Sequence, residues 1–324
     1  MFEKVNPMHP DKIADRIAGA IVDYAYSLDK DPIIQVETLL GHGEAMIIIE
    51  TNQKLEEEKI KEIVQRISKQ ALSIKLKIVK QDKHLADNQA DKIRCGDNGI
   101  FLGMPITYEE NLLSDLADSI YRKMPYDGKY LIDSVNKKLI ICQSNDYKDL
   151  LNTEYTQFFF PYRVDYEIII NPLGLWNGGL DVDSGAVNRK LGSDLGRSLT
   201  GGGIHGKDLS KADVTLTITT FIMAQILQKK VEISCKIGDE KVRALVDESY
   251  FVEFPYEVAV RFVKHFLTDF NDGDFSGAFE NLAAWGLQVH YHWDRLEDFE
   301  KVICETHVSK KNILKTKISR LFHV

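Results

Sequence analysis

The order of helix-like and strand-like segments in the first quarter of the chain restricts it to a fold that combines both kinds of structure. Apolar residues recur at steps of three and four over residues 10–28, with Pro10 suited to a first helical position, and predict an amphipathic helix. Two strand-like runs around the turn at 41–43 predict a hairpin. A second amphipathic helix at 55–72 and an alternating strand at 73–79 follow. Helices and strands mixed in this way point to an α+β or α/β class with mixed sheets.

The remainder of the chain continues this alternation. One helix is predicted at 106–124, and a long one starts at Leu209 and Ser210, where Ser210 and Asp213 match the S-x-x-D capping pattern. Predicted strands lie at 130–134, 137–144, 166–172, 231–238 and 241–248. Residues 80–99 are polar and aperiodic, which indicates either a disordered loop or a functional lid. The same coarse order recurs about three times, so internal duplication is a hypothesis.

Charge and cysteine content narrow the function classes. A net charge of -8 over 324 residues argues against a general affinity for nucleic acid or for an anionic membrane, but leaves room for a local basic pocket. The four cysteines are scattered, without a CxxC pair, and are predicted to be free thiols in a reducing compartment: Cys95, Cys142, Cys235 and Cys304. The sequence has no apolar signal core and no run long enough to span a bilayer, so a cytoplasmic protein is expected.

The stretch GGGIHGKDLSKAD at 201–213 is the most unusual motif. Gly201, Gly206 and Lys207 fit the phosphate-loop pattern GxxxxGK, but Asp208 stands where Ser or Thr should hold magnesium, and no buried strand precedes the motif. What remains is a glycine-rich backbone that can approach an anion closely, next to the charge of Lys207. A flexible surface loop with solvated charges is the alternative.

Three further segments combine a cation with a carboxylate at a turn or a helix start. They are HPDK at 9–12, PYDGK at 125–129 and DVDSGAVNRK at 181–190, and each alone is more typical of an ordinary turn or cap. Together with the VET…G…E hairpin, CGDNG, INPLGLWNGG and GGGIHGKDLSKAD, they occur in an order that resembles S-adenosylmethionine synthetase (methionine adenosyltransferase). The resemblance runs from about residue 5 to about residue 245.

The resemblance implies an α+β fold of three similar α/β-sandwich-like domains with pseudo-threefold symmetry and mixed sheets. Because their segments would interleave, the boundaries are approximate: an N-terminal domain at 1–80, an active-site lid at 81–95, a central domain at 96–172 and a C-terminal domain at 173–324. The resemblance also implies a reaction in which the methionine sulfur attacks C5′ of ATP. Tripolyphosphate leaves and is then hydrolysed to pyrophosphate and phosphate. A thioether has no proton to remove, so the main task is to stabilise a leaving group that gathers negative charge.

The resemblance also implies a role for individual residues. The catalytic residues, directed at the triphosphate, would be His9, Lys12, Lys129, Arg189, Lys190 and Lys207. The residues that bind ATP or its adenosine part would be Asp97, Asp127 and Trp176. Those that bind methionine would be Glu50, Gln81, Asp183 and Lys211. The metal ligands would be Asp11 and Asp213 for Mg²⁺ and Glu37 for K⁺.

Cofactors and partners follow from the same resemblance. Two Mg²⁺ ions per site and one K⁺ are expected, with ATP and L-methionine as substrates, in S-adenosylmethionine biosynthesis and one-carbon metabolism. A homodimer, or a dimer of dimers, with active sites between subunits is expected. The alternatives are a non-catalytic or regulatory relative that binds ATP or polyphosphate, the same reaction with a methionine analogue, and a kinase or phosphohydrolase. The last would need a proper phosphate loop or an activated hydroxyl, and the sequence offers neither.

Several features depart from the usual family pattern. Met8 stands where a glycine normally precedes HPDK, and His205 replaces an apolar aromatic residue in the glycine loop. The serine-rich strand that leads into HPDK is missing, and residues 270–293 replace the usual C-terminal oligomer contacts. Taken alone, Glu37 also fits a solvent-facing strand position, Trp176 fits core packing and Cys95 fits a packing or lid residue. The pair His290 and His292 is interpreted as structural.

Overall fold

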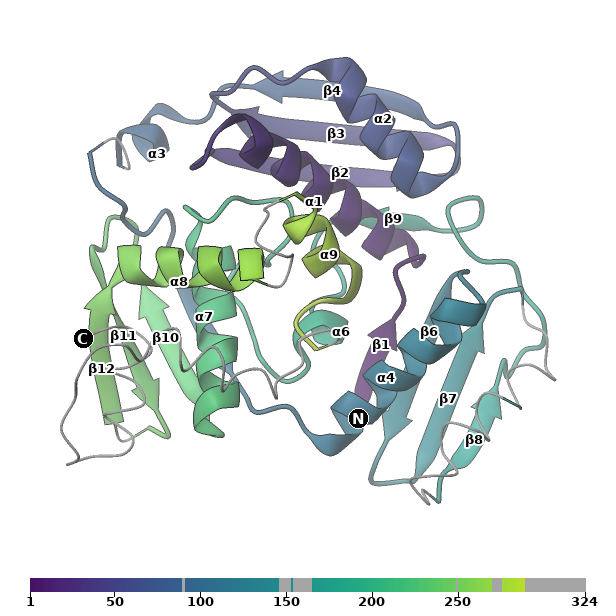
Figure 1. The fold of residues 1–324 in the computed structure, drawn as a ribbon. Coiled ribbons are helices and arrows are strands. Elements are labelled where there is room, and N and C mark those ends of the chain that lie inside the picture. The colour runs from purple at the N-terminus through teal and green to yellow at the C-terminus, as the bar shows by residue number, and fades with distance from the viewer. Residues whose placement is uncertain (89–90, 146–152, 154–164, 249, 270–275, 289–324) are drawn as a thin grey trace.

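The computed structural model describes residues 1–88, 91–145, 153, 165–248, 250–269 and 276–288. Within these residues the strands form three four-stranded sheets, which surround a central group of helices (Figure 1). The first sheet has the order β4-β3-β2-β9, with bounds Ser73–Val79, Glu44–Thr51, Ile34–Gly41 and Ser184–Ala186. The second has the order β1-β6-β7-β8, with bounds Phe2–Val5, Gly128–Asp133, Lys138–Gln143 and Glu167–Ile170. The third has the order β5-β10-β11-β12, with bounds Gly99–Gly103, Val231–Cys235, Lys241–Val246 and Tyr250–Pro255.

The three sheets share one plan. In each, a strand from elsewhere in the chain (β9, β1 or β5) pairs antiparallel with the first strand of a hairpin, and a fourth strand joins the other side. The fourth strand is parallel in the first two sheets, whereas β12 is antiparallel to β11. In the first sheet the parallel strand β4 follows helix α2 (Glu57–Ser68), because a parallel neighbour needs a crossover connection. The predicted α+β class with mixed sheets is confirmed, although the third sheet is wholly antiparallel.

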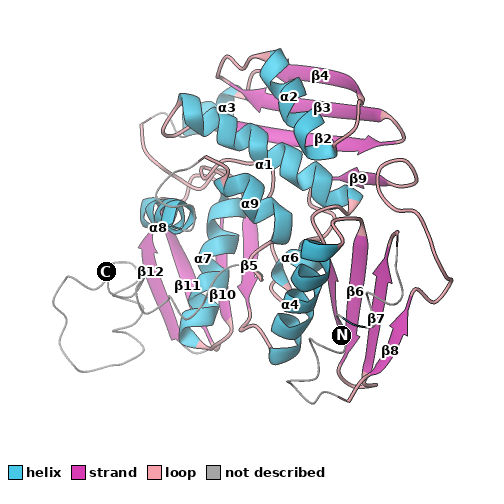
Figure 2. Cartoon of the chain, turned by 45° about the vertical axis from the view of Figure 1, so that its right-hand side comes forward, coloured by secondary structure: helices cyan, strands magenta, loops and turns pink. Residues whose placement is uncertain are grey.

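The helices cover the inner faces of the sheets (Figure 2). Helix α1 begins at Pro10, after His9 caps it by accepting the backbone N–H of Asp11, and ends at Leu28, as predicted. Further helices among the described residues are α3 (Lys83–Asn88), α4 (Tyr108–Lys123), α6 (Leu191–Leu195), α7 (Ala212–Leu227), α8 (Tyr256–Asp269) and α9 (Ala278–Trp285). In the described part of the chain no helix has the length and apolar character that crossing a membrane requires.

Two hydrophobic cores hold these layers together. The larger joins α1 and α2 with the first sheet, and α7 and α8 with the third, through side chains such as Ile17, Ile47, Phe221 and Ile233. The smaller lies between α4 and the second sheet and includes Leu116 and Tyr130. Periodicity predicted these apolar faces because burial requires them to repeat with the helix or the strand.

The structure corrects several local predictions. Ser210 does not cap α7: the helix begins at Ala212 with Lys211 as its N-cap, and the Ser210 backbone N–H donates instead to Asp208 Oδ1 at 2.6 Å. The aperiodic segment 80–99 contains the short helix α3, and strand β1 precedes HPDK where no lead-in strand was expected. The pair His290 and His292 lies outside the described residues. Because each sheet takes strands from separate stretches of chain, the linear domain boundaries stay a prediction.

The structure describes three of the four cysteines and part of the section at 270–293 that departs from the family pattern. Cys95, Cys142 and Cys235 are free thiols, and Cys95 is buried in the larger core. Cys304 lies outside the described residues, as does much of 270–293. The described part of that section includes α9, whose Phe279 stacks on Tyr26 of α1.

Candidate active site

The first group of predicted site residues meets at the start of α1. Asp11 is buried in the first turn, where Oδ1 accepts the backbone N–H of Ala186 at 2.9 Å and Oδ2 accepts Lys190 Nζ at 2.7 Å. Arg189 Nη1 lies 3.5 Å from Asp11 Oδ1, and the Arg189 side chain is otherwise exposed. Burial would raise the pKa of Asp11, but the bond from Lys190 and the other donors outweigh it and lower the pKa. This corner therefore holds an ionised carboxylate bordered by two cations.

His9 is a neutral hydrogen-bonding group at this corner. Burial, followed by the charge of Lys190, lowers the pKa of His9 to about 4. Its Nδ1 accepts the backbone N–H of Asp11 at 3.2 Å, so in the neutral imidazole the proton resides on Nε2. His9 can thus donate one hydrogen bond without adding charge.

Asp127 packs against the loop at 178–179 and lies close enough to Asp11 and Lys190 to feel their charges. Asp127 Oδ2 accepts the backbone N–H of Gly179 at 3.0 Å, whereas Oδ1 is buried without a hydrogen-bond partner among the described residues. Burial raises the pKa of Asp127 to about 6, and the nearby carboxylates of Asp183 and Asp11 act in the same direction. A buried acceptor of this kind favours a donor from a bound molecule.

The remaining members of this group are more exposed. Lys129 Nζ pairs with Glu3 Oε2 at 3.1 Å, and Asp183 lies exposed just before β9. Trp176 is half-buried, and its Nε1 donates to Asn171 Oδ1 at 3.3 Å. The Trp176 ring belongs to neither hydrophobic core of the described residues. We call these residues the α1 group: His9, Asp11, Asp127, Lys129, Trp176, Asp183, Arg189 and Lys190.

The second group is built on the glycine loop. Lys207 is nearly buried and donates to the Gly202 carbonyl at 2.9 Å and to the Asp213 carboxylate. A Cβ on Gly202 would lie 2.6 Å from Asp213 Oδ2, and a Cβ on Gly206 would lie 2.3 Å from the Val36 carbonyl oxygen. Gly206 also has φ +73°, which disfavours other residues. The glycines therefore let the loop backbone touch both α7 and β2.

Strand β2 brings further predicted residues to this loop. Gln35 forms a bridge with Lys207 on one side and pairs with Glu50 of β3 on the other. Glu37 lies two residues on, exposed, and accepts Gln35 Nε2 at 3.3 Å. Gln81 follows β4, and its buried Oε1 has no hydrogen-bond partner among the described residues. We call these residues the glycine-loop group: Glu37, Glu50, Gln81, Asp97, Lys207, Lys211 and Asp213.

Two members of the glycine-loop group lie at element ends. Lys211 is buried at the N-cap of α7. Asp97 is exposed shortly before β5, where Gly99 lies 3.3 Å from the position of a Cβ on Gly201. Among the described residues, hydrogen bonds and ion pairs connect members within each group but not across the two groups.

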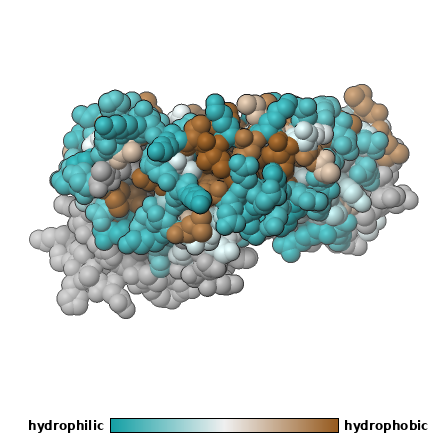
Figure 3. Space-filling model, turned by 90° about the horizontal axis from the view of Figure 1, so that it is seen from above, coloured by the Kyte–Doolittle hydropathy of each residue, from teal (hydrophilic) through white to brown (hydrophobic). Residues whose placement is uncertain are grey.

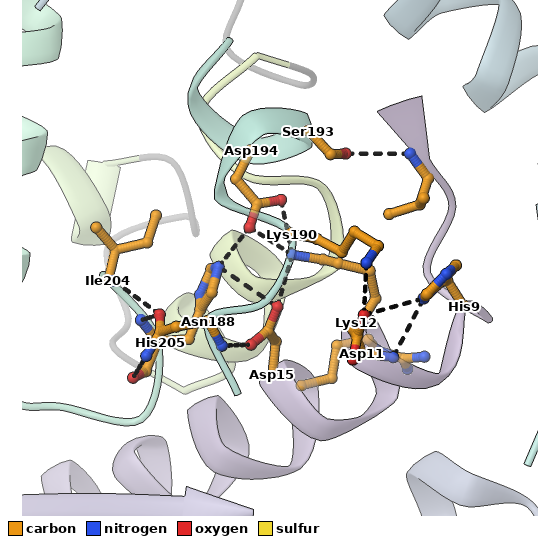
Figure 4. A network of polar contacts seen from close by, with 12 residues as sticks. His9, Asp11, Lys12, Asp15, Asn188, Lys190, Ser193, Asp194, Ile204 and His205 are labelled. Atoms are coloured by element: carbon orange, nitrogen blue, oxygen red, sulfur yellow. Dashed lines mark hydrogen bonds and ion pairs between the residues drawn. The ribbon is translucent and has the colours of Figure 1, made fainter. Parts of the chain in front are cut away.

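Lys12 differs from the other predicted cations, because its ammonium points into the protein (Figure 4). Its Nζ donates to Asp15 Oδ2 at 3.0 Å and to both oxygens of Asp194, at 2.7 and 2.8 Å. Burial would lower the pKa of Lys12, but Asp194 and Asp15 together raise it. His205 Nε2 contacts Asp194 Oδ2 at 2.7 Å on the other side. Spacing along the chain gave no signal for this network.

The same network has donors suited to a metal ion. Asp15, Asp194 and His205 offer ligand atoms that all lie within 4.8 Å of one another. The Lys12 ammonium already bonds to both carboxylates, so the cation that they require is part of the protein.

The comparisons with known proteins agree with the motifs. The sequence profile of the S-adenosylmethionine synthetase N-terminal domain matches residues 1–89. An S-adenosylmethionine synthase of Mesoplasma florum is 27% identical over 264 residues, covering 65% of this chain and 70% of the relative. One from Zymomonas mobilis is 27% identical over 293 residues, covering 71% and 75%.

A solved structure gives the same fold. It is described as an unusual S-adenosylmethionine synthetase from Campylobacter jejuni, is 20% identical, covers 93% of this chain and 98% of its own, and superposes with a TM-score of 0.65. The fold predicted from the resemblance, with its three similar domains, is thereby confirmed. This chain is therefore similar to S-adenosylmethionine synthetases over much of its length, and residues 1–89 match the profile of their N-terminal domain.

Proposed function

We propose that the chain is a methionine adenosyltransferase that forms S-adenosylmethionine from ATP and L-methionine in the cytoplasm. The sulfur lone pair attacks C5′, the C5′–O bond breaks, and its electron pair leaves with the tripolyphosphate, which is then hydrolysed to pyrophosphate and phosphate. The observation that carries the proposal is the pairing of lysines with carboxylates in both groups, Lys190 with Asp11 and Lys207 with Asp213. Such preorganised charges suit a reaction whose barrier lies in a polyanionic leaving group.

The α1 group would receive the departing triphosphate. Lys190, Arg189 and Lys129 supply positive charge, and His9 Nε2–H donates a hydrogen bond to the oxygen that leaves C5′. Because His9 is neutral at physiological pH, its donor does not depend on a proton gained from solvent.

The carboxylates Asp11 and Asp213 fit Mg²⁺. Each is largely buried, and each keeps acceptor capacity beyond its lysine partner. Mg²⁺ favours few carboxylates together with phosphate oxygens, and when bound it would neutralise charge on the triphosphate. Lys207 would then leave Asp213 and contact phosphate. Glu37, exposed next to Gln35, would supply one carboxylate ligand to K⁺.

The substrates would be held by the remaining members of the two groups. The buried Asp127 Oδ1 would accept a ribose hydroxyl, and Trp176, outside both cores, would stack on adenine. Asp97 would contact the adenosyl side. Glu50, Gln81, Asp183 and Lys211 would bind the amino and carboxylate ends of methionine, and the segment 81–95 would close over the site and exclude water.

The site would be completed by a second copy of the chain. Among the described residues no hydrogen bond or ion pair joins a member of one group directly to a member of the other. The outer faces of the sheets also expose paired apolar residues. Leu39 and Met46 lie opposite each other on β2 and β3 and are 53% and 47% exposed. Ile100 and Phe251 are exposed on the third sheet, and apolar patches interrupt the polar surface (Figure 3). We propose a homodimer, or a dimer of dimers, with each site made from the α1 group of one copy and the glycine-loop group of the other.

The test is product formation. The purified protein is incubated with ATP, L-methionine, Mg²⁺ and K⁺, and S-adenosylmethionine is followed by mass spectrometry while the phosphates are followed by phosphorus NMR. Methionine-dependent product with equal pyrophosphate and phosphate is expected. ATP binding without product would refute the transferase and favour a non-catalytic relative, whereas product only with another thioether would indicate a methionine analogue.

A further inference from the structure

We propose that His205 is a positioning residue that fixes the backbone of Lys207 against α1 and α6; this inference rests on the proposed function. His205 is buried, and its Nε2 lies 2.7 Å from Asp194 Oδ2 and 3.7 Å from Asp15 Oδ2. It is the only side chain of the Lys12–Asp15–Asp194 network, within the described residues, that comes from the glycine loop. The imidazole thus ties that loop to α6 and α1.

The backbone around His205 is held by the residue that precedes the cations of the α1 group. Asn188 Oδ1 accepts the backbone N–H groups of Ile204 and His205 at 2.9 and 3.0 Å, and Asn188 Nδ2 donates to the His205 carbonyl at 3.3 Å. The Asn188 backbone N–H donates in turn to Asp15 Oδ1 at 2.8 Å. Asn188 is followed directly by Arg189 and Lys190.

The anchor lies two residues before Lys207. Gly206 follows His205, with its carbonyl accepting the Val36 N–H at 2.6 Å, and then Lys207 reaches Asp213. One network therefore touches the segment that carries Arg189 and Lys190 on one side and the segment that carries Lys207 on the other. A shift of about 1 Å at a positioning contact can lower the rate by about 100-fold. Losing the imidazole contact is therefore expected to displace Lys207 and to lower kcat.

A metal ion is not needed to explain this cluster. The Lys12 ammonium already binds the carboxylates of Asp15 and Asp194. Because Asp194 is buried, its carboxylate stays ionised only with the support of Lys12 and His205. Replacing the imidazole by a ring without nitrogen removes one donor from a fully buried carboxylate whose pKa is held low by Lys12 and His205. The loop then loses its side-chain link to α6 while the backbone bonds to Asn188 remain.

Three substitutions separate positioning from simple stabilisation. His205→Phe keeps a ring but removes the donor, His205→Asn is smaller and too short to reach Asp194, and His205→Gln carries an amide donor at longer reach. The control is Gln225→Leu, which removes buried hydrogen bonds to Met104 and Ile106 at the far end of α7. The melting temperature of each protein is measured first. Turnover and the KM for ATP and for methionine are then measured well below it.

His205→Phe and His205→Asn are expected to lower kcat by about 10- to 100-fold with little change in the KM for methionine. His205→Gln is expected to recover most of the loss. Gln225→Leu is expected to melt earlier with an unchanged kcat. If His205→Phe does not fold, His205→Asn, which cannot clash, carries the test. An unchanged kcat in His205→Asn, or equal losses in His205→Gln and His205→Asn, would overturn the assignment.

The affinity for inorganic tripolyphosphate, measured by calorimetry, separates this inference from the proposed function. If the wild-type protein makes no S-adenosylmethionine, the proposed function fails. A loss of tripolyphosphate affinity in His205→Asn that His205→Gln restores would still support the positioning role, and equal affinity in all three proteins would overturn it.

Discussion

Replacing Lys4 by methionine is expected to change how stability depends on pH. Lys4 lies on β1 with its ammonium fully buried, donating to the carbonyl oxygens of Ser193 at 2.8 Å and Trp285 at 2.6 Å. Burial lowers the pKa of Lys4 from 10.5 to about 7; the charge of Asp194 opposes this shift and that of Lys12 adds to it. The unfolded chain keeps the ordinary lysine pKa.

The sign and size of the effect follow from proton binding. Between pH 7 and pH 10.5 the unfolded chain holds one more proton at Lys4 than the native protein, so the free energy of unfolding rises with pH. The contribution of neutral Lys4 to the free energy of unfolding is complete above pH 10.5 and is lost as pH falls through 7. One pKa unit corresponds to about 1.4 kcal/mol, and the native amine is half protonated at pH 7. The rise between pH 7 and pH 9 is therefore about 2 kcal/mol.

The assay is urea unfolding followed by circular dichroism at pH 7, 8 and 9. Wild type, Lys4→Met and the control Lys75→Met are compared, the last at an exposed lysine on β4. Relative to Lys4→Met, the wild type should gain about 2 kcal/mol across this range, because shared titrations cancel in the difference. The control should follow the wild type. Parallel curves for wild type and Lys4→Met would refute the reasoning.

Four other substitutions have defined outcomes. Asp23 accepts the N–H groups of Phe279 and Glu280 in the first turn of α9, and burial raises its pKa to about 7. The contribution of protonated Asp23 to the free energy of unfolding is therefore complete below the unfolded pKa of 3.8 and is lost as pH rises through 7. The wild type should lose about 2 kcal/mol relative to Asp23→Asn between pH 5 and pH 7 in urea unfolding, and an unchanged difference would contradict it. Lys207→Ala and Asp213→Asn should each lower kcat by about 100-fold or more with an intact circular dichroism spectrum, and near-wild-type turnover would remove that residue from the mechanism. Trp176→Ala should weaken ATP binding in calorimetry by about 1–3 kcal/mol, and an unchanged affinity would remove the stacking role.

Local patterns predicted much of the fold. Helix α1 and the hairpin of β2 and β3 were predictable because their apolar residues repeat with the period of the element that buries them. Strands β1 and β9 have only four and three residues, too few for a period, and are strands because β6 and β2 pair with them. The cap at Ser210 failed because Asp208 takes its N–H and Asp213 binds Lys207.

The site residues likewise divide into those that local motifs predict and those that depend on long-range contacts. The motifs predicted residues that the structure brings together around Asp11 and around Lys207, although their roles stay a prediction. The partners of Lys12 could not be predicted, because Asp194 lies 182 positions away and meets it only in the folded protein. The placement of His205 depends on the same long-range contact.

The strand order of the sheets has a consequence for synthesis on the ribosome. Strand β1 is made first, but its neighbour β6 begins only at Gly128, so at about 5–20 residues per second β1 waits roughly 6–25 s for a partner. Strand β5 waits in the same way for β10, which begins at Val231. During this time the nascent chain carries unpaired edges, which invite association with other chains. Production together with added chaperones should therefore raise the yield of this protein more than that of a protein whose sheets are completed by neighbouring segments.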